Sequence, residues 1–264
     1  MLILFMLPIL ALANNLQVTL WNSGTCPYAQ RAWIALKEKD IDFEFRIVDL
    51  QNKDDDFETT YYRANPDKLS SSKVPLLEVV DRDSDTEELI RYAFTESRVL
   101  LEVLEELFPN HHHLLPMGIQ ERYHARVFAD AIYDSIWGGE RSPYQILARK
   151  LKNNEAWDAT VEKERLVTML QSLQDSLETF HKDGPFVCGK YFTIAECMTA
   201  PFVQRADFVL KHYLDMDVNE ICQKEGFSRA GQWWDAVLNR KSVQETATAD
   251  PHTSIQRLMD RMKL

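Results

Sequence analysis

The first part of the chain alternates between the two-residue hydrophobic period of strands and the longer period of helices. Apolar residues recur at helical spacing between Pro27 and Lys39, whereas Phe43, Phe45 and Ile47 alternate with charged neighbours. The pattern predicts strands at 18–21, 43–48, 74–80 and 88–91, helices at 27–39 and from 97 to about 107, and a short helix or loop at 54–63. The acidic turn 81–85 joins the last two strands as a hairpin. The order β-α-β followed by β-β-α indicates a mixed sheet with helices.

Beyond residue 110 the strand pattern disappears and only helical spacing remains. Helices are predicted at 123–137, at 155–181, after Phe192 and around 233–238. The fold class is therefore α+β, with a mixed domain at 16–109 and an all-helical domain at 117–250. We interpret 251–264 as a C-terminal tail.

The sequence marks one helix start with particular clarity. Thr193 and Glu196 have the spacing of a capping box, in which each side chain accepts a hydrogen bond from the other residue's backbone amide. We interpret this motif as structural and assign no chemistry to it.

Composition and charge narrow the range of functions. A formal net charge of −11 leaves no basic surplus to neutralise phosphates, so nucleic acid is not an expected partner. The four cysteines are widely scattered without metal-ligand spacing, and free thiols are expected. The tract His111–His113 lies between prolines and is interpreted as a solvated linker, with adventitious metal binding as the alternative. No metal site is predicted.

The N-terminal residues 1–15 form an apolar leader. Residues 11–13 match a small-x-small cleavage pattern, but the leader has no Lys or Arg and is too short to cross a bilayer. It is either a secretory signal or a segment without structure, and we exclude it from the fold.

The tetrapeptide Cys26-Pro27-Tyr28-Ala29 lies between a predicted strand and a predicted helix. Proline favours the first helical position, which places Cys26 at the helix start. There a cysteine faces unpaired N–H groups and the positive end of the helix dipole, which favour its thiolate. Ala29 occupies the position of a second cysteine, so an external thiol must resolve any mixed disulfide. On these four residues alone, a small buried cysteine or a helix cap is the alternative.

Five motifs in the same order resemble those of the glutathione transferases, most closely the omega class with its dehydroascorbate reductase and lambda relatives. They are Cys26–Arg31, Val74–Glu78, the helix opened by Glu96-Ser97 and ending at Pro109, Gly189–Glu196, and Trp234–Leu238. The resemblance covers about residues 16–245 and implies a thioredoxin-like N-terminal domain followed by a helical bundle. Segments 54–73 and 89–96 are longer than is usual in the family.

The resemblance also implies a glutathione site. The peptide bond before Pro75 is expected to be cis, so that the backbone of Val74 pairs with the cysteinyl part of glutathione. Glu96 would receive the γ-glutamyl ammonium group, and Ser97, at a helix N-terminus, the γ-glutamyl carboxylate. Lys53 resembles the lysine that meets the glycyl carboxylate.

The function that the resemblance implies is a glutathione-dependent thiol transferase or dehydroascorbate reductase, working through a mixed disulfide between Cys26 and glutathione. Glutathione is then a co-substrate, and no tightly bound cofactor is expected. The second substrate would be a small oxidised or electrophilic compound, in a pocket for which Tyr133 and Trp137 are candidates. Their helical spacing favours the alternative that both are ordinary core aromatics.

Assembly, location and an alternative function complete the expectations. The family leads us to expect a homodimer and a cytoplasmic location, or the secretory pathway if residues 1–13 are a cleaved signal. The alternative function is that of a non-enzymatic member of the same fold, similar to the chloride intracellular channel proteins or to ligand-binding relatives. Binding of glutathione without turnover would favour that alternative.

Overall fold

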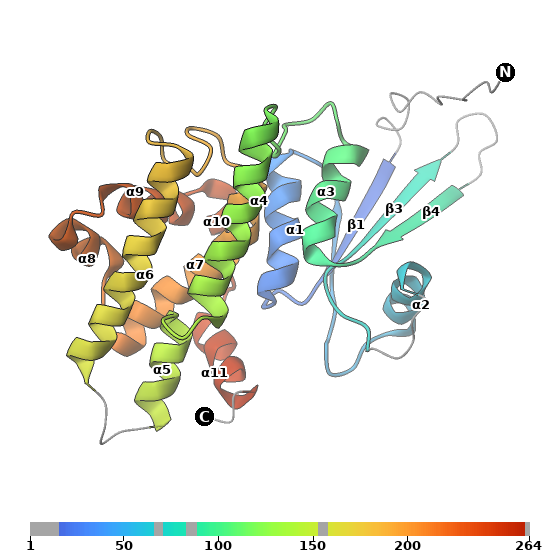
Figure 1. The fold of residues 1–264 in the computed structure, drawn as a ribbon. Helices are drawn as coiled ribbons and strands as arrows, with labels where there is room; N and C mark the ends of the chain where they lie inside the picture. Colours follow the sequence, from blue (N-terminus) through green and yellow to red (C-terminus); the bar gives the residue numbers. More distant parts are fainter. Residues whose placement is uncertain (1–15, 66–70, 83–88, 153–157, 262–264) are drawn as a thin grey trace.

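Four strands form one mixed sheet in the computed structural model, which describes residues 16–65, 71–82, 89–152 and 158–261 (Figure 1). The strands are β1 Leu16–Asn22, β2 Glu44–Ile47, β3 Leu76–Arg82 and β4 Leu89–Phe94. Their order in the sheet is β2-β1-β3-β4; β1 and β2 are parallel, and the other neighbours are antiparallel. Strand β3 begins at Leu76 rather than Val74, since Pro75 has no N–H to contribute to a ladder.

Helices cover both faces of this sheet. The helices are α1 Pro27–Glu38, α2 Asp55–Ala64 and α3 Ser97–Leu107. Because side chains alternate along a strand, Val18 and Leu20 of β1 lie in the main core with α1 and α3, whereas Trp21 packs against Phe57 of α2. The polar segment 54–63, for which the sequence allowed either a short helix or a loop, forms helix α2. Asp54 caps the start of this helix, where its side chain accepts a hydrogen bond from the Phe57 amide at 2.7 Å.

The second domain is helical throughout the part that the model describes. Its elements are α4 Ile119–Tyr133, a π-helical turn η2 Asp134–Gly138, α5 Pro143–Lys152, α6 Ala159–Phe180, α7 Ile194–Val209, a second π-helical turn η3 Leu210–Leu214, α8 Val218–Glu225, α9 Ser228–Leu238, α10 Lys241–Glu245 and α11 Pro251–Arg261. The predicted α+β class, with a thioredoxin-like domain before a helical one, is confirmed. No helix among the described residues is long and apolar enough to cross a membrane.

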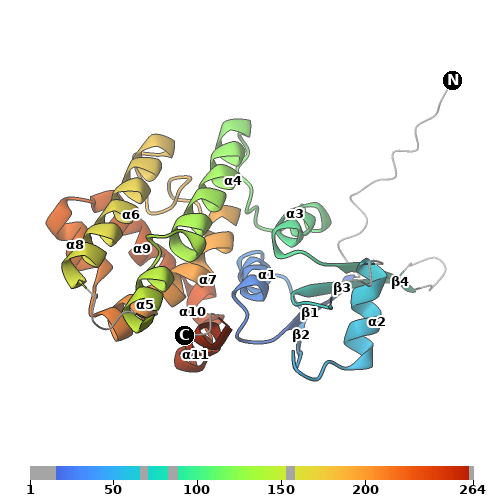
Figure 2. The same ribbon diagram turned by 60° about the horizontal axis from the view of Figure 1, so that its bottom comes forward.

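Helix α1 lies between the sheet and the second domain, where it packs on α7 (Figure 2). One hydrophobic core runs through both domains across this contact. Polar contacts also join the two domains. Arg240 donates two hydrogen bonds to the carboxylate of Glu38, at 2.8 and 2.6 Å. This ion pair holds the C-terminal end of α1 against the helical domain. At the start of α1, Arg205 of α7 donates to the carbonyl of Thr25, which places Cys26 at the junction of the two domains.

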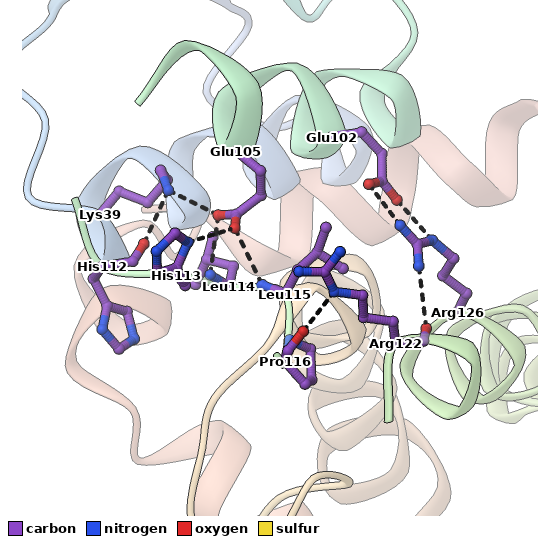
Figure 3. A network of polar contacts seen from close by, with 10 residues as sticks. All are labelled: Lys39, Glu102, Glu105, His112, His113, Leu114, Leu115, Pro116, Arg122 and Arg126. Carbon is purple, nitrogen blue, oxygen red and sulfur yellow. Dashed lines mark hydrogen bonds and ion pairs between the residues drawn. The ribbon is translucent and has the colours of Figure 1, made fainter. Parts of the chain in front are cut away.

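The linker between the domains is fastened by a buried ion pair (Figure 3). Lys39, with no side-chain exposure, donates to Glu105 at 2.7 Å and to the carbonyl of His112 at 2.9 Å. Glu105 also accepts from the amides of Leu114 and Leu115, at 3.0 and 3.4 Å. The histidine tract is thus bonded to the first domain rather than freely solvated.

The C-terminal segment differs from a simple tail. Residues 251–261 form helix α11, which packs on α7 and buries Ile255 and Met259 in the main core. The helical domain therefore extends beyond residue 250. The apolar leader 1–15 lies outside the described residues.

Candidate functional site

Cys26 is the N-cap residue of α1, as the motif predicts. Pro27 occupies the first helical position, and the Cys26 carbonyl accepts from the Gln30 amide at 3.1 Å. The thiol is free and half-buried, and it makes no capping hydrogen bond with the first turn. It packs against the smaller core cluster, which includes Trp21 and Val74. The nucleophile candidate is therefore in place with its sulfur unengaged.

A cavity of about 270 Å³ lies beside this helix start. Its lining residues all belong to the first domain: Tyr28, Tyr61, Lys73, Val74, Pro75, Thr95, Glu96 and Ser97. Four of the five predicted glutathione ligands are thus brought together here, and the Val74–Pro75 peptide bond is cis as expected. Because Val74 also packs in the cluster that Cys26 contacts, the cavity and the thiol are neighbours.

Backbone geometry at the rim agrees with a binding role for Glu96 and Ser97. Glu96 has a φ of +67°, a conformation that costs a non-glycine residue free energy and that persists mainly where surrounding structure imposes it. The exposed Glu96 carboxylate forms no hydrogen bond or ion pair with the described residues, while Ser97 begins α3. The Ser97 hydroxyl accepts from the Arg31 guanidinium at 3.2 Å. An anion at the start of α3 would meet both the helix dipole and this hydroxyl.

Lys53 is not among the residues that line the cavity. Its ammonium group donates to the carbonyl of Ser72 at 2.6 Å and so fixes the segment that leads into Val74. The cation that lines the cavity is Lys73, which is exposed. No sequence signal separated Lys73 from other surface lysines, because its position depends on how 71–75 turns before β3.

The two aromatic candidates lie at the domain junction. The Tyr133 hydroxyl is 2.8 Å from the hydroxyl of Tyr28, a cavity residue that sequence reasoning did not single out. Burial raises the pKa of Tyr28, and the hydrogen bond with Tyr133 raises it further, so this hydroxyl stays protonated at neutral pH. Trp137 lies deeper, with its ring 5.0 Å from Phe202 and 4.6 Å from Tyr144. Tyr133 thus reaches the site, whereas Trp137 belongs to the aromatic packing behind it.

Two buried arginines hold the start of α1 from behind. Arg31, 2 % exposed, donates to the carbonyl of Met198 at 2.9 Å, and burial lowers its pKa to about 10, so it stays charged at neutral pH. Arg205, 4 % exposed, donates to the carbonyl of Thr25 at 3.0 Å and to the side chain of Gln30 at 2.7 Å. Neither forms an ion pair with a carboxylate of the described residues. Sequence reasoning had no signal for Arg205, which lies far from Cys26 along the chain.

A larger cavity lies elsewhere. It measures about 930 Å³ at the other end of α1, where its lining includes Lys37, Glu38 and Arg240. Much of this charge is already paired, as in the bonds of Glu38 to Arg240 and Lys37 to Glu245, so we assign it no ligand. Among the described residues no group of three or more His, Cys, Asp or Glu side chains could hold a metal ion.

Comparison with known proteins agrees with this geometry. Residues 25–107 match the family model for the glutathione S-transferase N-terminal domain. A probable cytosolic glutathione S-transferase DHAR1 from Oryza sativa subsp. japonica is 24% identical over 229 residues, covering 87% of each chain. The structure of omega transferase 3C from Trametes versicolor is 23% identical with a TM-score of 0.65, covering 97% of this chain and 94% of that one.

A rice transferase, OsGSTU1, was solved in complex with glutathione. It is 23% identical with a TM-score of 0.63, and covers 95% of this chain and 98% of its own. At such identities the solved structures establish the fold alone. The predicted resemblance to the glutathione transferase superfamily is confirmed: the family model and the similarity to DHAR1 support it, and omega-class transferases share the fold.

Proposed function

We propose that this protein is a glutathione transferase of the cysteine type, which reduces mixed disulfides of glutathione, or dehydroascorbate, with glutathione as co-substrate. The observation that carries the proposal is Cys26 at the start of α1, beside a cavity that brings together Val74, Pro75, Glu96 and Ser97. The similarity to a protein named for dehydroascorbate reduction supports it. The homodimer and the cytoplasmic location stay predictions.

For a mixed disulfide the reaction has two exchange steps. The Cys26 thiolate attacks the glutathionyl sulfur, the substrate's S–S bond breaks, and the other half leaves as a thiolate that takes up a proton. The product is a Cys26–glutathione disulfide. A second glutathione thiolate then attacks this glutathionyl sulfur, which releases oxidised glutathione and restores Cys26. Ala29 offers no thiol for an internal resolution, so the second glutathione is required.

In this scheme the cavity residues position the substrate. The backbone of Val74, exposed by the turn at Pro75, would pair with the cysteinyl part of glutathione. Ser97 and the start of α3 would bind the γ-glutamyl carboxylate, and Glu96 the γ-glutamyl ammonium group. Lys73, rather than Lys53, is in position for the glycyl carboxylate.

The test is Cys26→Ser, assayed with the mixed disulfide of glutathione and 2-mercaptoethanol. We expect reductase turnover to fall about a thousandfold or more, since the nucleophile is removed. Cys222→Ala, which removes a buried thiol of α8, is the control and should retain activity. Mass spectrometry of the wild-type protein after one turnover without free glutathione should find the glutathionyl group on Cys26.

Retained turnover in Cys26→Ser would exclude this mechanism. Glutathione binding by the wild-type protein without any turnover would instead favour the non-enzymatic alternative.

A further inference from the structure

Near the start of α1 lie two arginines that no carboxylate of the described residues neutralises. The chain has a net charge of −11, and many of its arginines pair with carboxylates, as Arg126 does with Glu102 and Arg149 with Glu162. Arg205 and Arg257 form no ion pair with the carboxylates of the described residues. Both nevertheless meet at Thr25, the residue before Cys26.

The two arginines differ in burial and in the number of hydrogen bonds that they donate. Arg205 is buried and committed, because its Nη atoms donate to the carbonyls of Thr25 and Pro201 and to Gln30. Arg257 is exposed, and its hydrogen bond to the described residues is a long one, 3.4 Å from Nη1 to the Thr25 hydroxyl. A hydroxyl leaves most donors of a guanidinium unused. Of the two arginines, Arg257 is therefore the one that the described residues leave able to bind a ligand.

Helix α11 fixes where this cation lies. Ile255 and Met259, two positions before and after Arg257, are buried in the main core and hold the helix against α7. Figure 1 shows α11 beside the end of α1 at which the chain enters that helix. The guanidinium of Arg257 thus lies beside Thr25, the residue before the nucleophile, on an element other than those that line the glutathione cavity.

We propose that Arg257 selects the second substrate by charge: the acceptor is a mixed disulfide of glutathione whose other half carries a carboxylate. This inference rests on the proposed function and names its substrate class. With the glutathionyl half in the cavity, the other half points toward the helical domain. Its carboxylate would form a two-pronged bond with the planar guanidinium. The same cation would also steer an anion toward a protein whose net charge otherwise repels it.

Alkylation of Cys26 tests the charge without requiring turnover. The Cys26 thiolate is the nucleophile toward both iodoacetate and iodoacetamide. The ratio of the two rates is therefore independent of the fraction of the thiol that is ionised, and it reports the local electric field. The other three cysteines, Cys188, Cys197 and Cys222, are 8 %, 0 % and 3 % exposed, so early labelling is confined to Cys26. Intact-mass spectrometry gives both rates, and free 2-mercaptoethanol supplies the reference ratio.

The variants are Arg257→Gln, Arg257→Lys and the control Lys224→Gln, which removes an exposed positive charge on α8. We expect Arg257→Gln to lower the iodoacetate-to-iodoacetamide ratio about three- to tenfold at low salt, from the loss of one nearby charge. Arg257→Lys should keep most of the ratio, and Lys224→Gln should not change it. An unchanged ratio in Arg257→Gln, or equal slowing of both reagents, would overturn the proposal.

Turnover separates this inference from the function on which it rests. Mixed disulfides of glutathione with 3-mercaptopropionate, 2-mercaptoethanol and cysteamine differ mainly in charge. The wild-type kcat/KM should fall in that order, and Arg257→Gln should level it by slowing the anionic substrate and speeding the cationic one. Equal turnover of all three by the wild type overturns the charge selection but leaves the reductase intact. An alkylation ratio that depends on Arg257, without turnover of any disulfide, refutes the reductase and retains the anion site.

Discussion

Two tyrosine hydroxyls form a bond across the domain junction at the edge of the cavity. Tyr28 and Tyr133 are 2.8 Å apart at their oxygens, and the Arg31 guanidinium lies 5.3 and 5.1 Å from their ring centroids. Phe202 supplies a third ring, 4.8 Å from the same cation. Buried cations stacked on aromatic faces are favourable even without a carboxylate. The two tyrosines therefore link the first domain to the helical domain around the buried Arg31 guanidinium.

Removing either hydroxyl alone should lower the free energy of unfolding by more than half of the amount that is lost when both are removed. Tyr133→Phe keeps the ring contacts with Phe202 but leaves the half-buried Tyr28 hydroxyl without its partner, so we expect a loss of about 1–2 kcal/mol in the free energy of unfolding. Tyr28→Phe should cost a similar amount. The double variant should cost little more than either single one, because no hydroxyl is then left unpaired. Urea unfolding of all four proteins measures the coupling, and strictly additive losses would contradict it.

The sequence motifs identified the site residues whose positions depend on the local backbone conformation. Cys26 at a helix start, the turn at Pro75 and the Glu96-Ser97 helix entry all follow from short segments; the last two line one cavity, and Cys26 lies beside it. Lys73 and Arg257 could not be found this way. Each owes its position to packing between distant segments, which single-sequence patterns do not record.

Among the elements, α7 has the most heavily bonded start. Glu196, fully buried, accepts from the amides of Val187 and Thr193 at 2.9 Å each, from the Thr193 hydroxyl at 2.8 Å and from the Trp233 indole at 3.2 Å. The capping box predicted from Thr193 and Glu196 is present. Its carboxylate also joins α9 and the loop before α7, so it is more than a local cap.

We therefore expect Glu196→Ala to destabilise the protein by about 3 kcal/mol or more, because it leaves buried donors of Val187 and Trp233 without acceptors. The control is Asp217→Ala at the exposed start of α8, where the side chain accepts from Asn219 and Glu220. That cap should cost about 1 kcal/mol. Urea denaturation compares the two. Equal losses would show that Glu196 acts as an ordinary helix cap.

Helices with a marked apolar stripe were predicted, and helices that depend more on tertiary burial were missed. The pattern identified α1, α3 and α6, whose apolar stripes extend over several turns. It did not separate out α8, which is short, or α11, which is as long as α3 but is held by the burial of Ile255 and Met259. Helices of this length are marginal in isolation, so their sequences carry little local signal.

For the whole molecule, the arrangement of the domains depends on a linker fastened by one buried ion pair. Burial alone would raise the pKa of Glu105, but hydrogen bonds from Lys39 and from the amides of Leu114 and Leu115 outweigh it, and the pKa lies below its usual value. A carboxyl group with a lowered pKa contributes stability above its unfolded pKa of about 4.3. This contribution is lost as the pH falls below that value through the folded pKa.

Glu105→Gln should therefore destabilise the protein at pH 7 by about 3–5 kcal/mol, since the buried Lys39 ammonium loses its counter-charge. The matched control is Glu102→Gln on the same helix, whose partner Arg126 is exposed; that pair should be worth less than about 1 kcal/mol. Both pairs appear in Figure 3. Urea unfolding at pH 7 gives the two losses.

Acid titration then tests the coupling directly. The stability difference between wild type and Glu105→Gln should shrink as the pH falls below about 4.3, because the wild-type carboxyl group itself becomes neutral there. The difference between wild type and Glu102→Gln starts small and should change little. If the Glu105→Gln difference stayed constant down to full protonation, the ion pair would not be what joins the linker to the first domain. The amide contacts of Leu114 and Leu115, which a glutamine oxygen can also accept, would then account for the attachment.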